Sequence, residues 1–317
     1  MRDIRIAAAQ FEHRDNDKAF NLARIRQLTR LAVDQRAELI SFHEGCISGY
    51  SWIQPLTKTE LLDVAEPVPN GPSVNALISI AREFGVVVTA GLLERDDDGN
   101  IYNTYVLVNG DGMIGRFRKL HPFVNSHLSP GNEYAVFDVL DCKIGVLVCY
   151  DNNLPENVRI TAMLGAEILL MPHVTCCLPS QMPGRGTVDR AIWENRERDP
   201  VRLRQEFCGP KGREWLMRWL PARAYENGIY VVFTNPIGVD YDTIKPGLAM
   251  ILDPFGEVLV ECDSLGDAVT VGLLTEEKIG VSSGQRYLQA RRPELYKKLI
   301  EPQASVTAPG WQLERRN

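Results

Sequence analysis

The sequence predicts an α/β protein in which two mixed sheets, each covered by helices, pack face to face in one domain. Apolar runs typical of strands alternate with segments of helical periodicity, which indicates βαβ units. Turn signals such as Asp96-Asp97-Asp98-Gly99-Asn100 separate neighbouring strands and predict antiparallel hairpins beside those units. Because the same order recurs in two halves of the chain, we expect two sheets rather than one.

The first half opens with a strand from Ile4 to Phe11. A helix follows, because Leu22, Ile25 and Leu28 recur at helical spacing before a second strand at 39–42. Pro72 is typical of a helix start and Gly85 of a helix end. The further strands predicted in this half are 86–91, 102–108 and 115–119.

The second half repeats this order. The apolar run Ile144 to Val148 predicts a buried strand, and Pro155 opens a helix. The further strands expected are 167–172, 229–234, 248–252 and 258–260. We assign residues 1–285 to a single domain that carries a long insertion at about 178–218, of the kind that forms lids or binding loops. Residues 286–317 are assigned to a basic helix, 291–299, and a tail on a neighbouring subunit or in solvent.

Composition excludes several function classes. The formal charge is −6 and no long basic block occurs, so neither nucleic acid nor an anionic membrane is an expected partner, and a small molecule is. The amino terminus has no apolar signal-peptide core and no run is long enough for a membrane span, which predicts a cytoplasmic protein. Seven cysteines without a CxxC pair predict reduced thiols, with neither disulfides nor a metal site.

Three reactive side chains come at strand ends, where α/β sheets bind ligands. Cys149 ends the strand before Pro155, Glu44 ends the strand at 39–42, and Lys119 lies in an apolar frame after the strand at 115–119. Each alone is typical of an ordinary position: a buried thiol, a loop carboxylate and a surface amine. Together they supply a nucleophile, a base and a cation for a developing oxyanion.

This order resembles the nitrilase superfamily of carbon–nitrogen hydrolases, in its amidase and carbamoylase branches. The similarity extends along the chain. It is carried by Ala8-Ala9-Gln10, Gly71-Pro72, Tyr102-Asn103-Thr104, Ser129-Pro130-Gly131, Cys149-Tyr150-Asp151, Pro155-Glu156, Gly165-Ala166-Glu167, Arg223-Ala224 with Glu226-Asn227, and Asp253-Pro254-Phe255-Gly256.

The resemblance implies a four-layer α-β-β-α sandwich, a homodimer or higher homo-oligomer, and a mechanism that uses no cofactor or metal. By position, Cys149 would attack the amide carbon and Glu44 would shuttle the proton. Lys119 and the backbone amide of Tyr150 would hold the oxyanion, and water would then release the acid from a thioester.

The chain departs from the family in the loop 123–131, where a second glutamate is usual and no acid occurs. Asn125 or His127 would take its place, or Glu133 would fold back from beyond the turn. His127 is equally a plain surface histidine.

The neighbours of these strand ends are the predicted pocket residues. They are Tyr50, Trp52, Asn152, Asn153, His173 and Val174, and Asn125 and Tyr150 are also expected to bind substrate. Arginines of the insertion would favour a substrate with a carboxylate.

Three functions follow. The first is hydrolysis of a small linear amide or N-carbamoyl compound, and the second is hydrolysis of a nitrile to the acid. Tyr150-Asp151 favours the amide, because true nitrilases usually carry Trp-Glu after the cysteine. The third is a catalytically weak binding or assembly protein on the same scaffold, which the missing glutamate suggests.

Overall fold

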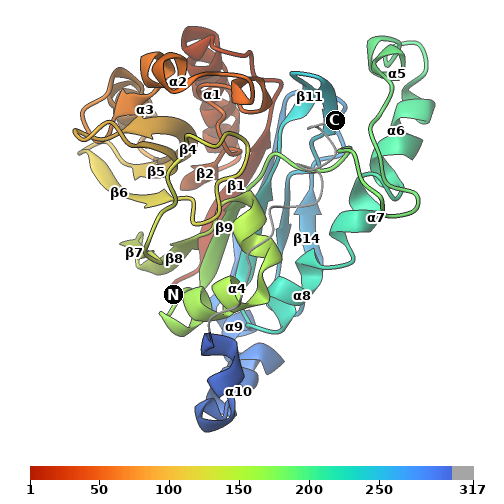
Figure 1. The fold of residues 1–317 in the computed structure, drawn as a ribbon. Helices are drawn as coiled ribbons and strands as arrows, with labels where there is room; N and C mark the ends of the chain where they lie inside the picture. The colour runs from red at the N-terminus through yellow and green to blue at the C-terminus, as the bar shows by residue number, and fades with distance from the viewer. Residues whose placement is uncertain (302–317) are drawn as a thin grey trace.

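The computed structural model describes residues 1–301 and places two mixed sheets face to face (Figure 1). The first sheet has the order β15 (Ala268–Leu274), β1 (Ile4–Gln10), β2 (Leu39–Ser41), β4 (Val87–Arg95), β5 (Ile101–Val108) and β6 (Met113–Arg118), with β3 (Glu66–Pro67) beside β4. The second has the order β14 (Val258–Glu261), β13 (Met250–Leu252), β10 (Tyr230–Thr234), β9 (Ile168–Pro172), β8 (Cys142–Val146) and β7 (Val136–Val139). The predicted fold class is confirmed.

The two sheets share one pairing pattern. In the first, β1, β2 and β4 are parallel, and β15, β5 and β6 are antiparallel to their neighbours. In the second, β8, β9 and β10 are parallel, and β7, β13 and β14 are antiparallel. The two halves read from the sequence are therefore two copies of one sheet arrangement.

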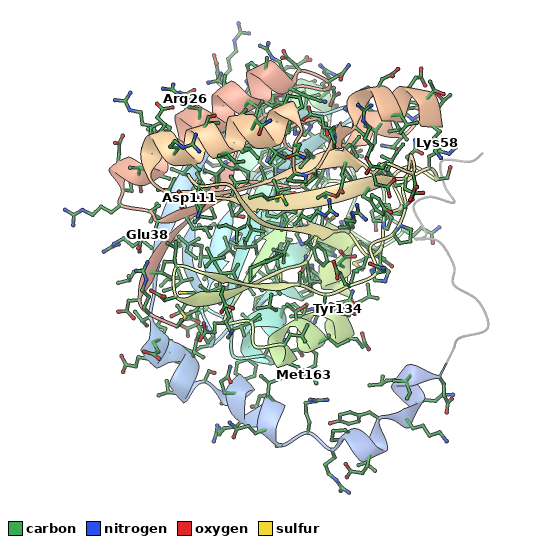
Figure 2. All side chains as sticks on the ribbon, turned by 90° about the vertical axis from the view of Figure 1, so that its left-hand side faces the viewer. Arg26, Glu38, Lys58, Asp111, Tyr134 and Met163 are labelled. Atoms are coloured by element: carbon green, nitrogen blue, oxygen red, sulfur yellow. The ribbon has the colours of Figure 1, made fainter. Side chains whose placement is uncertain are left out.

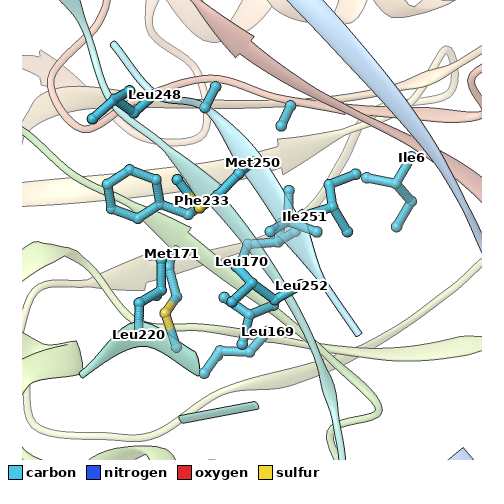
Figure 3. Packing of buried hydrophobic residues seen from close by; sticks show 14 of the residues in the cluster. Ile6, Leu169, Leu170, Met171, Leu220, Phe233, Leu248, Met250, Ile251 and Leu252 are labelled. Atoms are coloured by element: carbon cyan, nitrogen blue, oxygen red, sulfur yellow. The ribbon is translucent and has the colours of Figure 1, made fainter. Parts of the chain in front are cut away.

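The main core lies between the sheets. Successive side chains of a strand point to opposite faces, so β1 sends Ile6 and Ala8 toward the second sheet and Ala7 and Ala9 toward the outer helices. In Figure 3, Ile6 lies on the same cluster as Leu169 and Leu170 of β9 and Ile251 and Leu252 of β13.

Helices cover the outer faces. α1 (Lys18–Asp34) and α3 (Pro72–Phe84) lie on the first sheet, with Arg26 of α1 turned to solvent (Figure 2). α4 (Pro155–Met163) and α8 (Leu220–Tyr225) lie on the second. As expected, Pro72 stands in the first turn of α3 and Gly85 caps its end with a φ of 67°.

The remaining elements are short. They are η1 (Ser51–Ile53), α2 (Lys58–Val64), η2 (Cys149–Asn153), α5 (Arg190–Glu194), α6 (Pro200–Cys208), α7 (Arg213–Leu216), α9 (Glu276–Val281), α10 (Ser283–Gln289), η3 (Pro293–Leu295), η4 (Lys297–Ile300), and the paired strands β11 (Ile237–Asp240) and β12 (Thr243–Pro246). α5, α6 and α7 occupy the predicted insertion. No described helix is both long and apolar enough to cross a bilayer.

The predicted helix over 291–299 is wrong. Two 3-10 turns, η3 and η4, stand there instead, and Arg292 has the non-helical angles φ −118° and ψ 77°, because Pro293 disfavours helical backbone at the residue before it. The predicted tail from residue 302 onward lies outside the described residues. β3, β7, β11, β12 and β15 were not predicted.

Candidate active site

The candidate site lies where strands of both sheets end. Glu44 follows β2, Lys119 follows β6 and Cys149 follows β8. The turn that carries Glu44 stays beside β4, because the Ile47 amide donates to the Gly91 carbonyl at 3.1 Å. Gly91 is needed for this approach, since a Cβ there would lie 2.4 Å from the backbone nitrogen of Gly45. A glycine in β4 thus allows the turn with Glu44 to pack closely.

Glu44 is fully buried, and only one of its oxygens is occupied. Oε1 accepts from Lys119 Nζ and from Asn103 Nδ2, each at 2.6 Å. Oε2 has no hydrogen-bond partner among the described residues. Two donors therefore orient the carboxylate and leave its second oxygen available for a proton.

Lys119 is held as a cation. Burial alone would lower its pKa, but the Glu44 carboxylate, helped by that of Asp151, outweighs burial, so the pKa is raised well above its usual value. Nζ also donates to the Tyr50 hydroxyl at 3.1 Å. A fixed ammonium of this kind can stabilise an oxyanion.

Cys149 opens η2 with a φ of 51°, in the left-handed region that is uncommon for residues other than glycine. Its side chain is buried, and Sγ lies 4.0 Å from the carbonyl oxygen of Val174. Burial, followed by the charge of Glu44, raises the pKa of the thiol to about 12, although Lys119 acts in the opposite direction. At neutral pH the side chain is a thiol, so it needs a base when it attacks.

Asp151 joins the two loops that carry Lys119 and Cys149. Its fully buried carboxylate accepts from the amides of Leu120 at 3.1 Å and His121 at 2.9 Å, and from the Val148 amide at 3.3 Å. It is a positioning residue that sequence reasoning identified only as part of a motif. Its signal was an acid directly after a buried strand end.

Two further positioning residues were missed in the same way. Asn103 of β5 orients Glu44, as described above. Arg223 of α8 donates to the carbonyls of Asn152 at 3.0 Å and Asn153 at 3.1 Å, so it holds the far side of the turn that carries Cys149. Both residues were noted only as elements of family motifs.

The predicted pocket residues separate into two groups. Tyr50, His173 and Val174 lie against the three candidate catalytic side chains, since Tyr50 contacts Lys119, Val174 contacts Cys149, and the charge of Lys119 acts on His173. Tyr150 is half-buried and packs edge-on against Phe123, with ring centroids 5.4 Å apart. Of the others, Asn153 is half-buried with its carbonyl bound to Arg223, and Trp52 donates from Nε1 to the Ser48 carbonyl at 2.9 Å.

Asn125 lies apart from them. Its side-chain nitrogen donates to the carbonyls of Ile53 at 2.9 Å and Leu56 at 2.8 Å, and its oxygen accepts from the His127 amide at 2.9 Å. These bonds fasten the loop 123–131 to the segment after Tyr50. His127 and Glu133 are exposed. In the described chain, the Lys119 ammonium instead donates to the Tyr50 hydroxyl and lies over the Phe123 ring, whose centroid is 4.7 Å from Nζ.

One group in the described chain has metal-ligand geometry: His13, Asp15 and Asp240. Both carboxylate oxygens of Asp240 already accept hydrogen bonds: Ser51 Oγ donates to Oδ2 at 2.5 Å and the Ser51 amide donates to Oδ1 at 3.0 Å. Lys245 Nζ lies 3.7 Å from Oδ2. With a cation already beside it, this carboxylate fits a structural role better than that of a metal ligand.

Fold and site together define a two-sheet α/β sandwich with a buried cysteine, glutamate and lysine at its strand ends. The chain belongs to the carbon–nitrogen hydrolase family, whose model matches residues 5–280.

Individual relatives agree with this assignment. An (R)-stereoselective amidase of Pseudomonas sp is 31% identical over 262 residues, which cover 81% of this chain and 80% of the relative. N-carbamoylputrescine amidase of Solanum lycopersicum is 28% identical, with 94% of this chain and 95% of the relative covered. Among solved structures, a mutant of the Nesterenkonia AN1 amidase from the nitrilase superfamily superposes with a TM-score of 0.69 at 23% identity, covering 94% of this chain and 97% of that one. That likeness shows the shared fold.

Proposed function

We propose that this protein hydrolyses a linear amide or N-carbamoyl bond of a small molecule, with Cys149 as nucleophile, Glu44 as proton shuttle and Lys119 as oxyanion donor. One observation carries the proposal: a protonated, buried thiol stands beside a carboxylate with one oxygen fixed and the other unoccupied. Relatives named as amidases and as an N-carbamoylputrescine amidase support the substrate class.

In the acylation step, Sγ of Cys149 attacks the amide carbon while Glu44 Oε2 takes the thiol proton. The carbonyl oxygen becomes negative and is stabilised by the Lys119 ammonium and the Tyr150 amide. The carbon–nitrogen bond then breaks, and Glu44 returns the proton to the leaving nitrogen. Ammonia or an amine departs and a thioester on Cys149 remains.

In the deacylation step, Glu44 takes a proton from a water molecule that attacks the thioester carbon. The carbon–sulfur bond breaks, the thiol regains the proton and the carboxylic acid leaves. Each step passes one proton through Glu44, so a single unoccupied carboxylate oxygen is sufficient for both acylation and deacylation.

A substrate panel tests this proposal. Ammonia release is measured from linear amides, ureido acids and nitriles with the intact protein and with Cys149→Ala, and Cys262→Ala serves as a control for a buried thiol in another part of the core. We expect turnover of an amide or ureido acid that Cys149→Ala abolishes and Cys262→Ala keeps. Turnover of nitriles alone would support the nitrilase alternative, and no turnover of any substrate would support a binding or assembly role.

Mass spectrometry provides a second readout. A substrate that forms a slowly hydrolysed thioester should leave its acyl mass on the peptide containing Cys149. An adduct on Cys176 or Cys177 would refute the assignment of the nucleophile.

We further propose that the protein is a cytoplasmic homodimer. The seven cysteines are all unpaired, which suits a reducing compartment. Met163 at the end of α4, Leu164 directly after it and Tyr225 of α8 are exposed, and Met163 lines a cavity of about 800 Å³. Sedimentation should give twice the mass of the chain, and Met163→Glu should shift it toward the monomer. A monomeric intact protein would contradict this assembly.

A further inference from the structure

A row of aromatic and cationic side chains begins at His173, which follows β9 and feels the charge of Lys119. It continues through Trp219, which precedes α8, to Trp215 of α7 and Arg185 of the insertion. The His173 and Trp219 rings have centroids 5.7 Å apart, and Trp219 and Trp215 are also 5.7 Å apart. The Arg185 guanidinium lies over the Trp215 ring, 3.9 Å from its centroid. The row therefore leads from the end of β9 into the insertion.

Three members of the row carry a buried donor without an acceptor. Trp219 Nε1 and Arg185 Nε have no hydrogen-bond partner among the described residues. His173 is 1% exposed, and its Nδ1 is also unpartnered within residues 1–301. Buried donors are normally satisfied in proteins, so three in one row indicate an acceptor supplied from outside the chain.

The histidine is a donor at Nδ1 for a structural reason. Asn152 Nδ2 donates to the Leu147 carbonyl at 2.7 Å, which fixes the orientation of the amide, and the same nitrogen lies 3.2 Å from His173 Nε2. Nε2 is therefore the acceptor. Burial, with the charge of Lys119, lowers the pKa of His173 well below its usual value, so the ring is neutral and its single proton is on Nδ1.

The cation in the row lacks a counter-ion. No carboxylate of residues 1–301 forms an ion pair with Arg185, and partial burial lowers its pKa. Burial raises the pKa of Cys176, which lies two residues after Val174, and the charges of Arg185 and Lys245 act in the opposite direction. The unpaired cation is thus in electrostatic contact with the segment that lines the nucleophile.

We propose that His173, Trp219 and Arg185 form a subsite for a carboxylate on the substrate, at the end away from the bond that is cleaved. A carboxylate only accepts hydrogen bonds and offers two oxygens, which matches N–H donors and an unpaired guanidinium better than a neutral amide or hydroxyl would. This subsite deepens the proposed function and rests on it, because it assigns an anionic amide or ureido acid to the same active site.

Matched substrates test the subsite. Amides with a terminal carboxylate, with two to four methylene groups between the two functions, are compared with methyl ketones of the same length. We expect the intact protein to favour the carboxylate in kcat/KM by roughly 10- to 100-fold, the range for a charge-assisted hydrogen bond. Arg185→Met should collapse that ratio toward one, and Trp219→Phe, which keeps the ring and removes the N–H, should reduce it.

The control is Arg190→Met, in the same insertion. Arg190 is exposed and already paired with Glu194 at 3.0 Å, so its loss should leave the ratio unchanged. An equal fall in the ratio for Arg190→Met and Arg185→Met would overturn the subsite. A preference of the intact protein for the ketone would overturn it as well, while leaving the amidase proposal in place.

Binding separates the two proposals if no substrate is turned over. Calorimetry on Cys149→Ala protein compares the dissociation constants of the carboxylate and ketone amides at low and high salt. Tighter, salt-sensitive binding of the carboxylate that Arg185→Met removes would support the subsite even if hydrolysis fails. Equal binding of both compounds would refute it.

Discussion

Replacing Asp151 by Asn tests whether this buried carboxylate positions Lys119. An amide has one acceptor oxygen, so if that oxygen stays with His121, the amides of Leu120 and Val148 lose their acceptor. Each buried donor left unsatisfied costs about 1–3 kcal/mol, so the unrelaxed total is about 2–6 kcal/mol. We expect the melting temperature to fall by several degrees.

The activity should fall further than the stability loss explains. Leu120 adjoins Lys119, and a displacement of about 1 Å at a catalytic group can cost roughly 100-fold in rate. We therefore expect kcat to drop by about two orders of magnitude while KM changes little, measured by ammonia release at a temperature where the variant is folded.

Asp253 offers a matched control. It is equally buried but lies in the turn between β13 and β14. Its Oδ1 accepts from the amides of Phe255 at 2.9 Å and Glu257 at 3.1 Å, and its Oδ2 accepts from Lys278 Nζ at 2.7 Å. Asp253→Asn keeps one oxygen for both amides but removes the acceptor of Lys278, so it should lower the melting temperature and leave kcat intact. The positioning argument is refuted if Asp151→Asn matches Asp253→Asn in both measurements.

Three further predictions concern the same site. Tyr50→Phe removes the hydroxyl that accepts from Lys119, so kcat should fall about tenfold with little change in melting temperature, measured by steady-state kinetics and thermal unfolding. Asn103→Leu frees Glu44 from one of its two donors and should lower kcat/KM by about tenfold or more, measured on the best amide. The pKa of Cys149 is raised to about 12, so its thiolate should be absent at pH 7 and appear only in strong alkali. The measurement is the thiolate absorbance of the intact protein minus that of Cys149→Ala. A Cys149 thiolate at neutral pH would contradict the mechanism.

Tyr102→Phe provides the control for Tyr50→Phe. Tyr102 is a half-buried residue of β5 whose side chain points to the face opposite that of Asn103, and its hydroxyl donates to Asp96 at 3.2 Å. Its loss should leave kcat unchanged.

The sequence predicted the site residues whose position depends only on where a strand ends. Glu44 and Lys119 follow strands of the first sheet and Cys149 follows a strand of the second, and ligands bind at the carboxyl ends of such strands. One helix, α3, was equally readable, because Pro72 marks its start and Gly85 its end by their own backbone preferences.

Roles that depend on a partner from a distant segment were not readable. Asn125 lies in the loop where an acid was expected, but its side chain donates to the carbonyls of Ile53 and Leu56. Nothing near Asn125 in the sequence indicates that it contacts the segment 53–56. Likewise, Arg185 lies in a loop segment of the insertion, and only the fold brings it onto Trp215. Pairings of this kind are set by tertiary contacts.

The charges around Cys149 explain why the site needs no thiolate at rest. Glu44 and Lys119 are buried and already neutralise one another at 2.6 Å, so a thiolate would add an unpaired charge to the same low-dielectric space. Burial and Glu44 accordingly keep the thiol protonated. Charge then appears only as the proton moves to Glu44 and the substrate oxygen becomes negative beside Lys119. The ion pair thus favours the transition state over the resting thiolate.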